Sequence, residues 1–112
     1  MIAVADAGPL MALAKINSLD LLSRLFSQVY LTPSVYAETV IAGYAVNAAD
    51  AGLIERAITF GQLHQRAPTS IVSLEAVPLH SGERESLALA LEISADVLLI
   101  DDLRHVVLQR MF

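Results

Sequence analysis

A chain of 112 residues has the length of one domain and is too short for two, so we expect residues 1–112 to form a single unit. Hydrophobic residues make up 55% of the chain, against about 45–50% in ordinary soluble domains, and the mean hydropathy of +0.58 excludes a disordered polypeptide. Twelve acidic and seven basic residues give a net charge of −5, which argues against binding nucleic acid through a broad basic surface.

The sequence contains no cysteine, which excludes disulfides and thiolate zinc sites. The three histidines, His64, His80 and His105, lack the paired spacing of a zinc motif. Any bound metal is therefore expected to be a hard cation held by oxygen atoms. No apolar run approaches the roughly 18 residues that span a bilayer, and the first residues lack the basic and apolar regions of a signal peptide. We expect a cytoplasmic protein with no membrane partner.

The first third of the chain alternates strand-forming and helix-forming segments. Ile2–Ala5 predicts a strand, and Asp6–Pro9 ends it and opens a helix, with Pro9 as a first helical residue. Ser18 is placed to cap a second, short helix. Residues 29–31 then predict another short strand.

A capping pair follows this strand. Thr32 and Pro33 predict the start of a helix that carries Glu38 and stops at Gly43. Residues 48–63 have the composition of a further helix.

The last third repeats the alternation. Residues 71–74 predict a third strand, residues 83–93 a helix, and residues 97–100 a short, wholly apolar strand. Asp101 and Asp102 end this strand and are expected to open a last helix. Strands that alternate with helices predict an α/β fold with a central parallel sheet of about four strands and helices on both faces.

The acidic residues fall at positions that this fold brings together. Asp6 ends the first strand, Asp101 and Asp102 end the last, and Glu38 and Glu83 lie in helices that follow strands. Chemistry in an open parallel sheet collects outside the carboxyl ends of the strands, so these side chains could reach one crevice. Two like charges about 4 Å apart repel by roughly 4 kcal/mol at an effective dielectric of about 20. Such a cluster needs either protonation or a divalent cation such as magnesium, which could activate water against a phosphodiester.

Each acid also has a purely structural explanation. Asp6 could be a turn or cap residue, and Asp101 or Asp102 could cap the last helix. Glu83 could stabilise a helix start, and Glu38 could be an ordinary exposed helical residue. The remaining acids are expected at a helix start or on the solvated surface: Glu85, Asp20, Asp50, Glu55, Glu75, Glu92 and Asp96.

Other chemistries lack their sequence patterns. Gly8 stands outside any phosphate-binding glycine motif, and no G-x-S-x-G nucleophile elbow occurs. A phospho-acceptor receiver domain would need its acidic pair after the first strand and a lysine after the last, whereas the only lysine is Lys15.

Three segments resemble, in order, three blocks of the PIN-domain family, especially a prokaryotic branch. These segments are VADAGPLMALAKINSLDLLSRLF, YLTPSVYAETV and LHSGERESLALALEISADVLLIDDLRHVVLQRMF. The resemblance assigns metal-binding and catalytic roles to Asp6, Glu38, Glu83 and Asp101, with Asp102 as a neighbouring or substitute metal ligand. It implies a three-layer α/β/α sandwich and an endoribonuclease that depends on Mg²⁺ or Mn²⁺ and acts on RNA. It also implies frequent homodimers and, for many bacterial and archaeal members, a toxin that a cognate antitoxin silences.

The chain departs from the family pattern in two ways. Relatives usually continue beyond the acidic pair with another strand and closing helices, so we expect the family's final strand and helix to be missing and an uncovered sheet edge to favour a homodimer. Glu83 stands where many relatives have aspartate, which could alter metal preference. The alternative hypothesis is a non-catalytic PIN-like interaction module.

Overall fold

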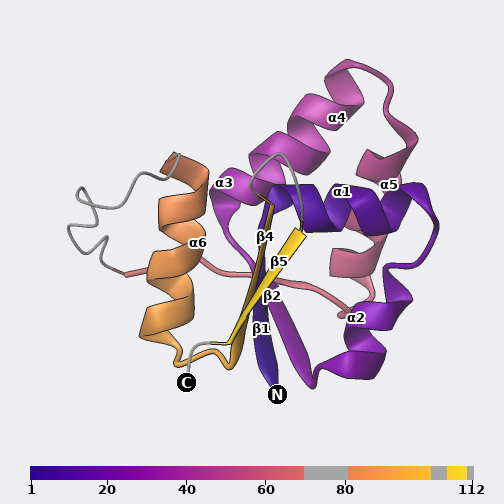
Figure 1. The fold of residues 1–112 in the computed structure, drawn as a ribbon. Helices are drawn as coiled ribbons and strands as arrows, with labels where there is room; N and C mark the ends of the chain where they lie inside the picture. Colours follow the sequence, from indigo (N-terminus) through magenta and orange to yellow (C-terminus); the bar gives the residue numbers. More distant parts are fainter. Residues whose placement is uncertain (70–80, 102–105, 111–112) are drawn as a thin grey trace.

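The computed structural model describes residues 1–69, 81–101 and 106–110, and Figure 1 shows their arrangement. These residues form a five-stranded sheet in the order β3-β2-β1-β4-β5. The elements along the chain are β1 (Ile2–Ala5), α1 (Ala7–Lys15), α2 (Asp20–Leu25), β2 (Gln28–Leu31), α3 (Pro33–Tyr36), the π-helix η1 (Ala37–Ile41), α4 (Ala42–Ala45), α5 (Ala49–Thr59), β3 (His64–Gln65), α6 (Ser81–Glu92), β4 (Val97–Asp101) and β5 (Val106–Arg110).

Four strands of the sheet are parallel, as the sequence predicts. β1 pairs with β2 on one side and β4 on the other, and β2 pairs with β3. The fourth parallel strand is β3 at His64–Gln65, whereas the strand predicted at residues 71–74 lies outside the described residues.

The expected last helix is wrong over Val106–Arg110, which forms β5 and pairs antiparallel with β4. This segment begins with two valines and a leucine, which suit a pleated surface, and its backbone satisfies the N–H and C=O groups along the outer edge of β4. The outer edge of β4 is therefore paired, and β5 forms the edge of the sheet on this side.

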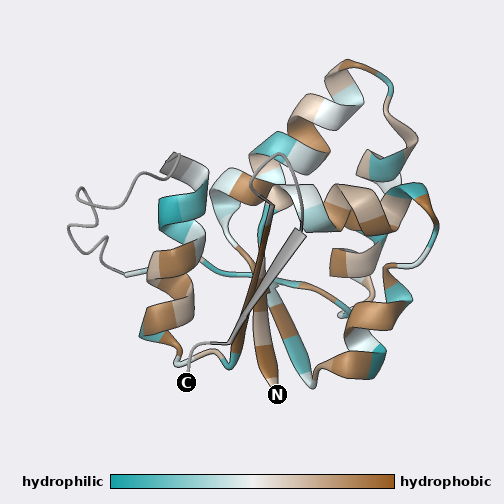
Figure 2. Cartoon of the chain, in the orientation of Figure 1, coloured by the Kyte–Doolittle hydropathy of each residue, from teal (hydrophilic) through white to brown (hydrophobic). Residues whose placement is uncertain are grey.

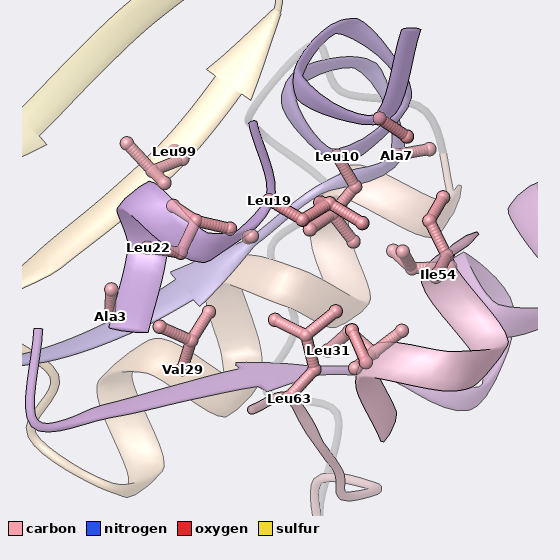
Figure 3. Packing of buried hydrophobic residues seen from close by; sticks show 14 of the residues in the cluster. Ala3, Ala7, Leu10, Leu19, Leu22, Val29, Leu31, Ile54, Leu63 and Leu99 are labelled. Carbon is pink, nitrogen blue, oxygen red and sulfur yellow. The ribbon is translucent and has the colours of Figure 1, made fainter. Parts of the chain in front are cut away.

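The inner strands are buried on both faces because successive side chains alternate between two hydrophobic clusters. Ala3 and Ala5 of β1 face the cluster under α1, α2 and α5, while Val4 faces the cluster that contains Leu89 and Ala90 of α6. Figure 3 shows the larger cluster, with side chains from strands and helices pointing toward one another. Helices therefore lie on both sides of the sheet (Figure 1), which gives the expected three-layer α/β/α arrangement.

The helix that opens at Pro33 is capped as predicted, since the Thr32 hydroxyl oxygen accepts a hydrogen bond from the Val35 amide at 3.3 Å. It runs through α3, η1 and α4 past the stop predicted at Gly43 and ends before Asn47, whose φ of 57° is left-handed. Gly43 instead serves helix packing, because a Cβ at this position would lie 2.7 Å from the Cβ of Ala51.

The second short helix, α2, is confirmed, but its predicted cap is not. Ser18 uses its hydroxyl to donate to the Ile16 carbonyl, and no side chain caps α2. Figure 2 shows hydrophobic residues along the inner strands and mixed surfaces on the helices. Among the described residues, no helix combines the length and the apolar character needed to cross a bilayer.

Candidate functional site

The order of the strands reverses direction between β1 and β4. The chain steps outward from β1 to β2 and β3, and it returns to the other side of β1 as β4. Such a reversal leaves space outside the carboxyl ends of the two strands, because the connecting helices lie on opposite faces of the sheet. Asp6 directly follows β1 and Asp101 is the last residue of β4. The backbone amide of Asp6 donates to the Leu99 carbonyl at 2.9 Å, which ties the end of β1 to β4.

Asp6 is a buried carboxylate, with 8% of its surface exposed. Its backbone takes the N-cap position of α1, but its side chain makes no capping hydrogen bond. One carboxylate oxygen, Oδ1, instead accepts a hydrogen bond of 3.0 Å from the Ser86 hydroxyl of α6. The capping explanation therefore does not account for the side chain of Asp6.

The surroundings of Asp6 disfavour its negative charge. Burial is the main cause that raises the pKa of Asp6 above its ordinary value of 3.8, and the hydrogen bonds from Ser86 and the Ala7 amide lower it in part. The charges of Glu83 and then Glu38 raise the pKa of Asp6 further. The site therefore concentrates negative charge around a group with little access to water.

Glu38 reaches this neighbourhood from the helix that follows β2. It lies in the first turn of η1, where Thr39 and Val40 are buried and Glu38 is exposed. The Ala42 amide donates to the Ala37 carbonyl, five residues back, so this turn holds one more residue than an α-helical turn. Single π-turns of this kind occur frequently at functional sites.

Glu83 reaches the neighbourhood from the opposite face of the sheet. It is half-buried in the first turn of α6. This helix packs on β1 and β4 through Leu89 and Ala90, and it precedes β4 in a parallel crossover. A crossover helix runs back against its strands, so the start of α6 lies at the edge of the sheet where β1 ends.

For Asp101 the structure gives the backbone alone. Its backbone pairs with Val106 of β5 at the end of β4, on the same edge of the sheet as Asp6. The side chain of Asp101 and the whole of Asp102 lie outside the described residues.

Two contacts of the site were missed from the sequence. Ser86 lies three residues after Glu83, a helical spacing that places both on one face and could have marked the serine. Glu85, expected only to stabilise a helix start, accepts a hydrogen bond from the Ser34 hydroxyl of α3. This contact joins the two helices that carry Glu38 and Glu83.

The candidate metal ligands suit a hard cation, because all of them are carboxylate oxygens. One of them, Asp6, is deeply buried beside like charges. Within the described residues, no three acidic or histidine side chains gather closely enough to hold one metal ion. Magnesium is usually held by one or two carboxylates together with water and substrate phosphates, so the described acids meet that smaller requirement.

Comparison with protein families gives a match over nearly the whole chain. A family model described as a PIN domain matches residues 2–106. Neither the curated proteins nor the solved structures gave a match.

Proposed function

The chain belongs to the PIN-domain family, whose members are generally nucleases, and on this premise we propose that it is an endoribonuclease dependent on Mg²⁺ or Mn²⁺. It hydrolyses phosphodiester bonds of RNA in the cytoplasm. The proposed metal-binding and catalytic carboxylates are Asp6, Glu38, Glu83 and Asp101, with Asp102 as an additional metal ligand.

The observation that carries this proposal is the environment of Asp6. A buried carboxylate beside two further acids costs stability unless a cation or a proton neutralises it. Selection for stability alone would favour an uncharged residue at the position of Asp6. A bound divalent cation would neutralise these carboxylates and remove the repulsion between them.

Each residue has a defined part in the proposed reaction. Asp6 and Asp101 approach from the ends of neighbouring strands, and Glu38 and Glu83 approach from helices on the two sides of the sheet. When bound, a divalent cation supplies a more acidic water and stabilises negative charge on the phosphodiester. The acidic side chains would hold the cation, and the substrate phosphate would be oriented through that cation. Because the net charge of the chain is −5, electrostatic attraction between the protein surface as a whole and RNA contributes little to binding.

Cleavage of a fluorescent RNA in the presence of Mn²⁺ tests the proposal. We expect cleavage by the wild type, and no cleavage by Asp6→Asn, by Asp101→Asn or in excess EDTA. Ser27→Ala is the matched control, because Ser27 precedes β2 and its hydroxyl donates to the Met1 carbonyl at the opposite edge of the sheet from Asp6, and this variant should retain full activity. Absence of both cleavage and Mn²⁺-induced thermal stabilisation in the wild type would contradict the proposal and favour a non-catalytic interaction module.

We also propose that the protein forms a homodimer and is the toxin of a toxin–antitoxin pair. Large hydrophobic side chains are exposed on the helices after β2, including Ile41, Tyr44 and Val46 with 60%, 49% and 74% of their surfaces exposed, and such residues favour association. A basic antitoxin would complement the acidic charge of this chain. Light scattering on the purified protein should give twice the monomer mass of 12.0 kDa, and a monomer at all concentrations would contradict the dimer.

A further inference from the structure

Ser86 differs from the other buried hydroxyl residues of the described chain. Thr32, Thr39 and Ser86 each expose 1% or less of their surface. The Thr32 hydroxyl accepts from the Val35 amide and the Thr39 hydroxyl donates to the Val35 carbonyl, so both serve the backbone of their own helix. The Ser86 hydroxyl instead donates to the carboxylate of Asp6, 80 positions earlier in the sequence.

This hydrogen bond restricts how the Asp6 carboxylate can turn. The torsion that rotates a carboxylate about its last bond is broad, so packing alone holds it weakly. The side chain of Asp6 makes no N-cap hydrogen bond, and its only contact with the backbone of α1 that the structure records is with the Ala7 amide at the start of that helix. The Ser86 hydroxyl donates to Oδ1 at 3.0 Å, and because Ser86 is fully buried in α6, this bond favours one orientation of the carboxylate.

We propose that Ser86 is a positioning residue for divalent-cation binding: its hydroxyl holds Oδ1 of Asp6 so that the carboxylate is already oriented when the cation arrives. This inference rests on the proposed function. It assigns the role to the hydroxyl group and not to the small size of serine. Residues that hydrogen-bond a metal-ligating side chain typically change metal affinity by about 10- to 100-fold when they are removed.

A role in packing alone predicts a different result. If α6 only needs a small residue where it crosses the end of β1, alanine would serve as well as serine. The methyl group of threonine would then be harmful, although threonine keeps the hydroxyl. Alanine and threonine therefore separate the two explanations.

The test is a titration of the full chain with Mn²⁺, monitored by isothermal titration calorimetry. It is carried out at a fixed neutral pH and well below the melting temperature. Ser86→Ala is expected to weaken Mn²⁺ binding by about 10- to 100-fold. Ser86→Thr should bind within a few-fold of the wild type. Ser27→Ala loses a hydroxyl that donates to the Met1 carbonyl at the far end of β1, and it should bind as the wild type does.

The outcomes separate this inference from the proposed function. If the wild type binds Mn²⁺ and Ser86→Ala binds it equally well, the role of Ser86 is overturned while the proposed function stands. If the wild type binds no Mn²⁺, both are overturned. Should Ser86→Ala fail to fold, Ser86→Cys replaces it, because a thiol is a weak donor of similar size and Mn²⁺ prefers oxygen ligands. Unchanged affinity in the cysteine variant would equally overturn the inference.

Discussion

Asp6 occupies a helix N-cap position without using its side chain as a cap. An aspartate at such a position ordinarily stabilises the helix by accepting hydrogen bonds from the first backbone amides. Here the carboxylate accepts from the Ser86 hydroxyl as well as from the Ala7 amide, and it lies beside the charges of Glu83 and Glu38, so helix stability alone does not explain its surroundings.

The neighbouring glutamates should have measurable and unequal effects on Asp6. Glu83→Gln and Glu38→Gln each remove a like charge, so each should lower the pKa of Asp6, and Glu83→Gln should lower it more. Carbon-13 NMR titration of the Asp6 carboxyl group in EDTA measures this. Glu55→Gln is the control, because Glu55 binds Tyr44 on the neighbouring helices. An unchanged pKa in both test variants would show that the three acids do not converge.

The pH dependence of stability follows from the same shift. Because the pKa of Asp6 is raised in the folded state, the folded protein binds this proton more tightly than the unfolded chain. Its contribution to stability is complete below pH 3.8 and is lost as the pH rises through the folded-state pKa. Thermal unfolding in EDTA should therefore show Asp6→Asn gaining stability relative to the wild type as the pH rises through this window. If the unfolding temperature of Asp6→Asn minus that of the wild type stays constant or falls as the pH rises through this window, the shift is contradicted.

At this scale the sequence selected candidate acids, whose metal-binding roles stay predictions, but it did not indicate their hydrogen-bond partners. Asp6, Glu38 and Glu83 could be selected because they follow strands, and the charges of both glutamates do act on Asp6. The bond between Ser86 and Asp6 depends on how α6 docks on β1, which spacing within one helix does not determine. Asp96 was expected on the solvated surface, yet it is half-buried and accepts a hydrogen bond from the Ile2 amide at 2.8 Å.

The elements themselves were more predictable where the chain carries strong local signals. The Thr32–Pro33 cap and the apolar strand that became β4 were predicted close to their observed bounds. The π-turn at Ala37–Ile41 and the strand β5 were not predicted. A single extra residue in a turn has no recognised sequence signal here, and the strand state of β5 depends on its antiparallel pairing with the preceding strand β4. The expected stop at Gly43 failed because this glycine permits close packing of two helices.

Gly43 and Gly52 offer a matched pair that tests this packing. Gly43→Ala should destabilise the protein by about 1–3 kcal/mol, because the new methyl group would overlap Ala51 at 2.7 Å. Gly52→Ala should stabilise it by about 0.5–1 kcal/mol, because only the Tyr44 hydroxyl lies near, at an ordinary 3.7 Å, and alanine favours the helix. Urea denaturation measures both changes in the free energy of unfolding, provided that this free energy depends on urea concentration with the same slope in each variant and in the wild type. Stabilisation by Gly43→Ala would contradict the close contact between α4 and α5.

At the scale of the whole molecule, the order of the strands brings together residues that lie far apart in the sequence. The order β3-β2-β1-β4-β5 places the ends of β1 and β4 side by side, although nearly the full length of the chain separates Asp6 from Asp101. The helices of the two outer layers then bring Glu38 and Glu83 towards the same edge. Alternation of strands and helices was sufficient to predict that β1 and β4 end at one edge of the sheet, because parallel strands share one carboxyl edge, and convergence of the four side chains on one cation stays a prediction.

Paramagnetic broadening by Mn²⁺ tests this convergence most directly. At substoichiometric Mn²⁺, backbone amide signals around Asp6, Glu38, Glu83 and Asp101 should broaden together, while those around Ser27 at the far end of the sheet stay sharp. The four segments come from different elements, so only a shared site broadens them at one concentration. Uniform broadening, or broadening confined to separate acids such as Asp20, Asp50 and Glu55, would contradict the account.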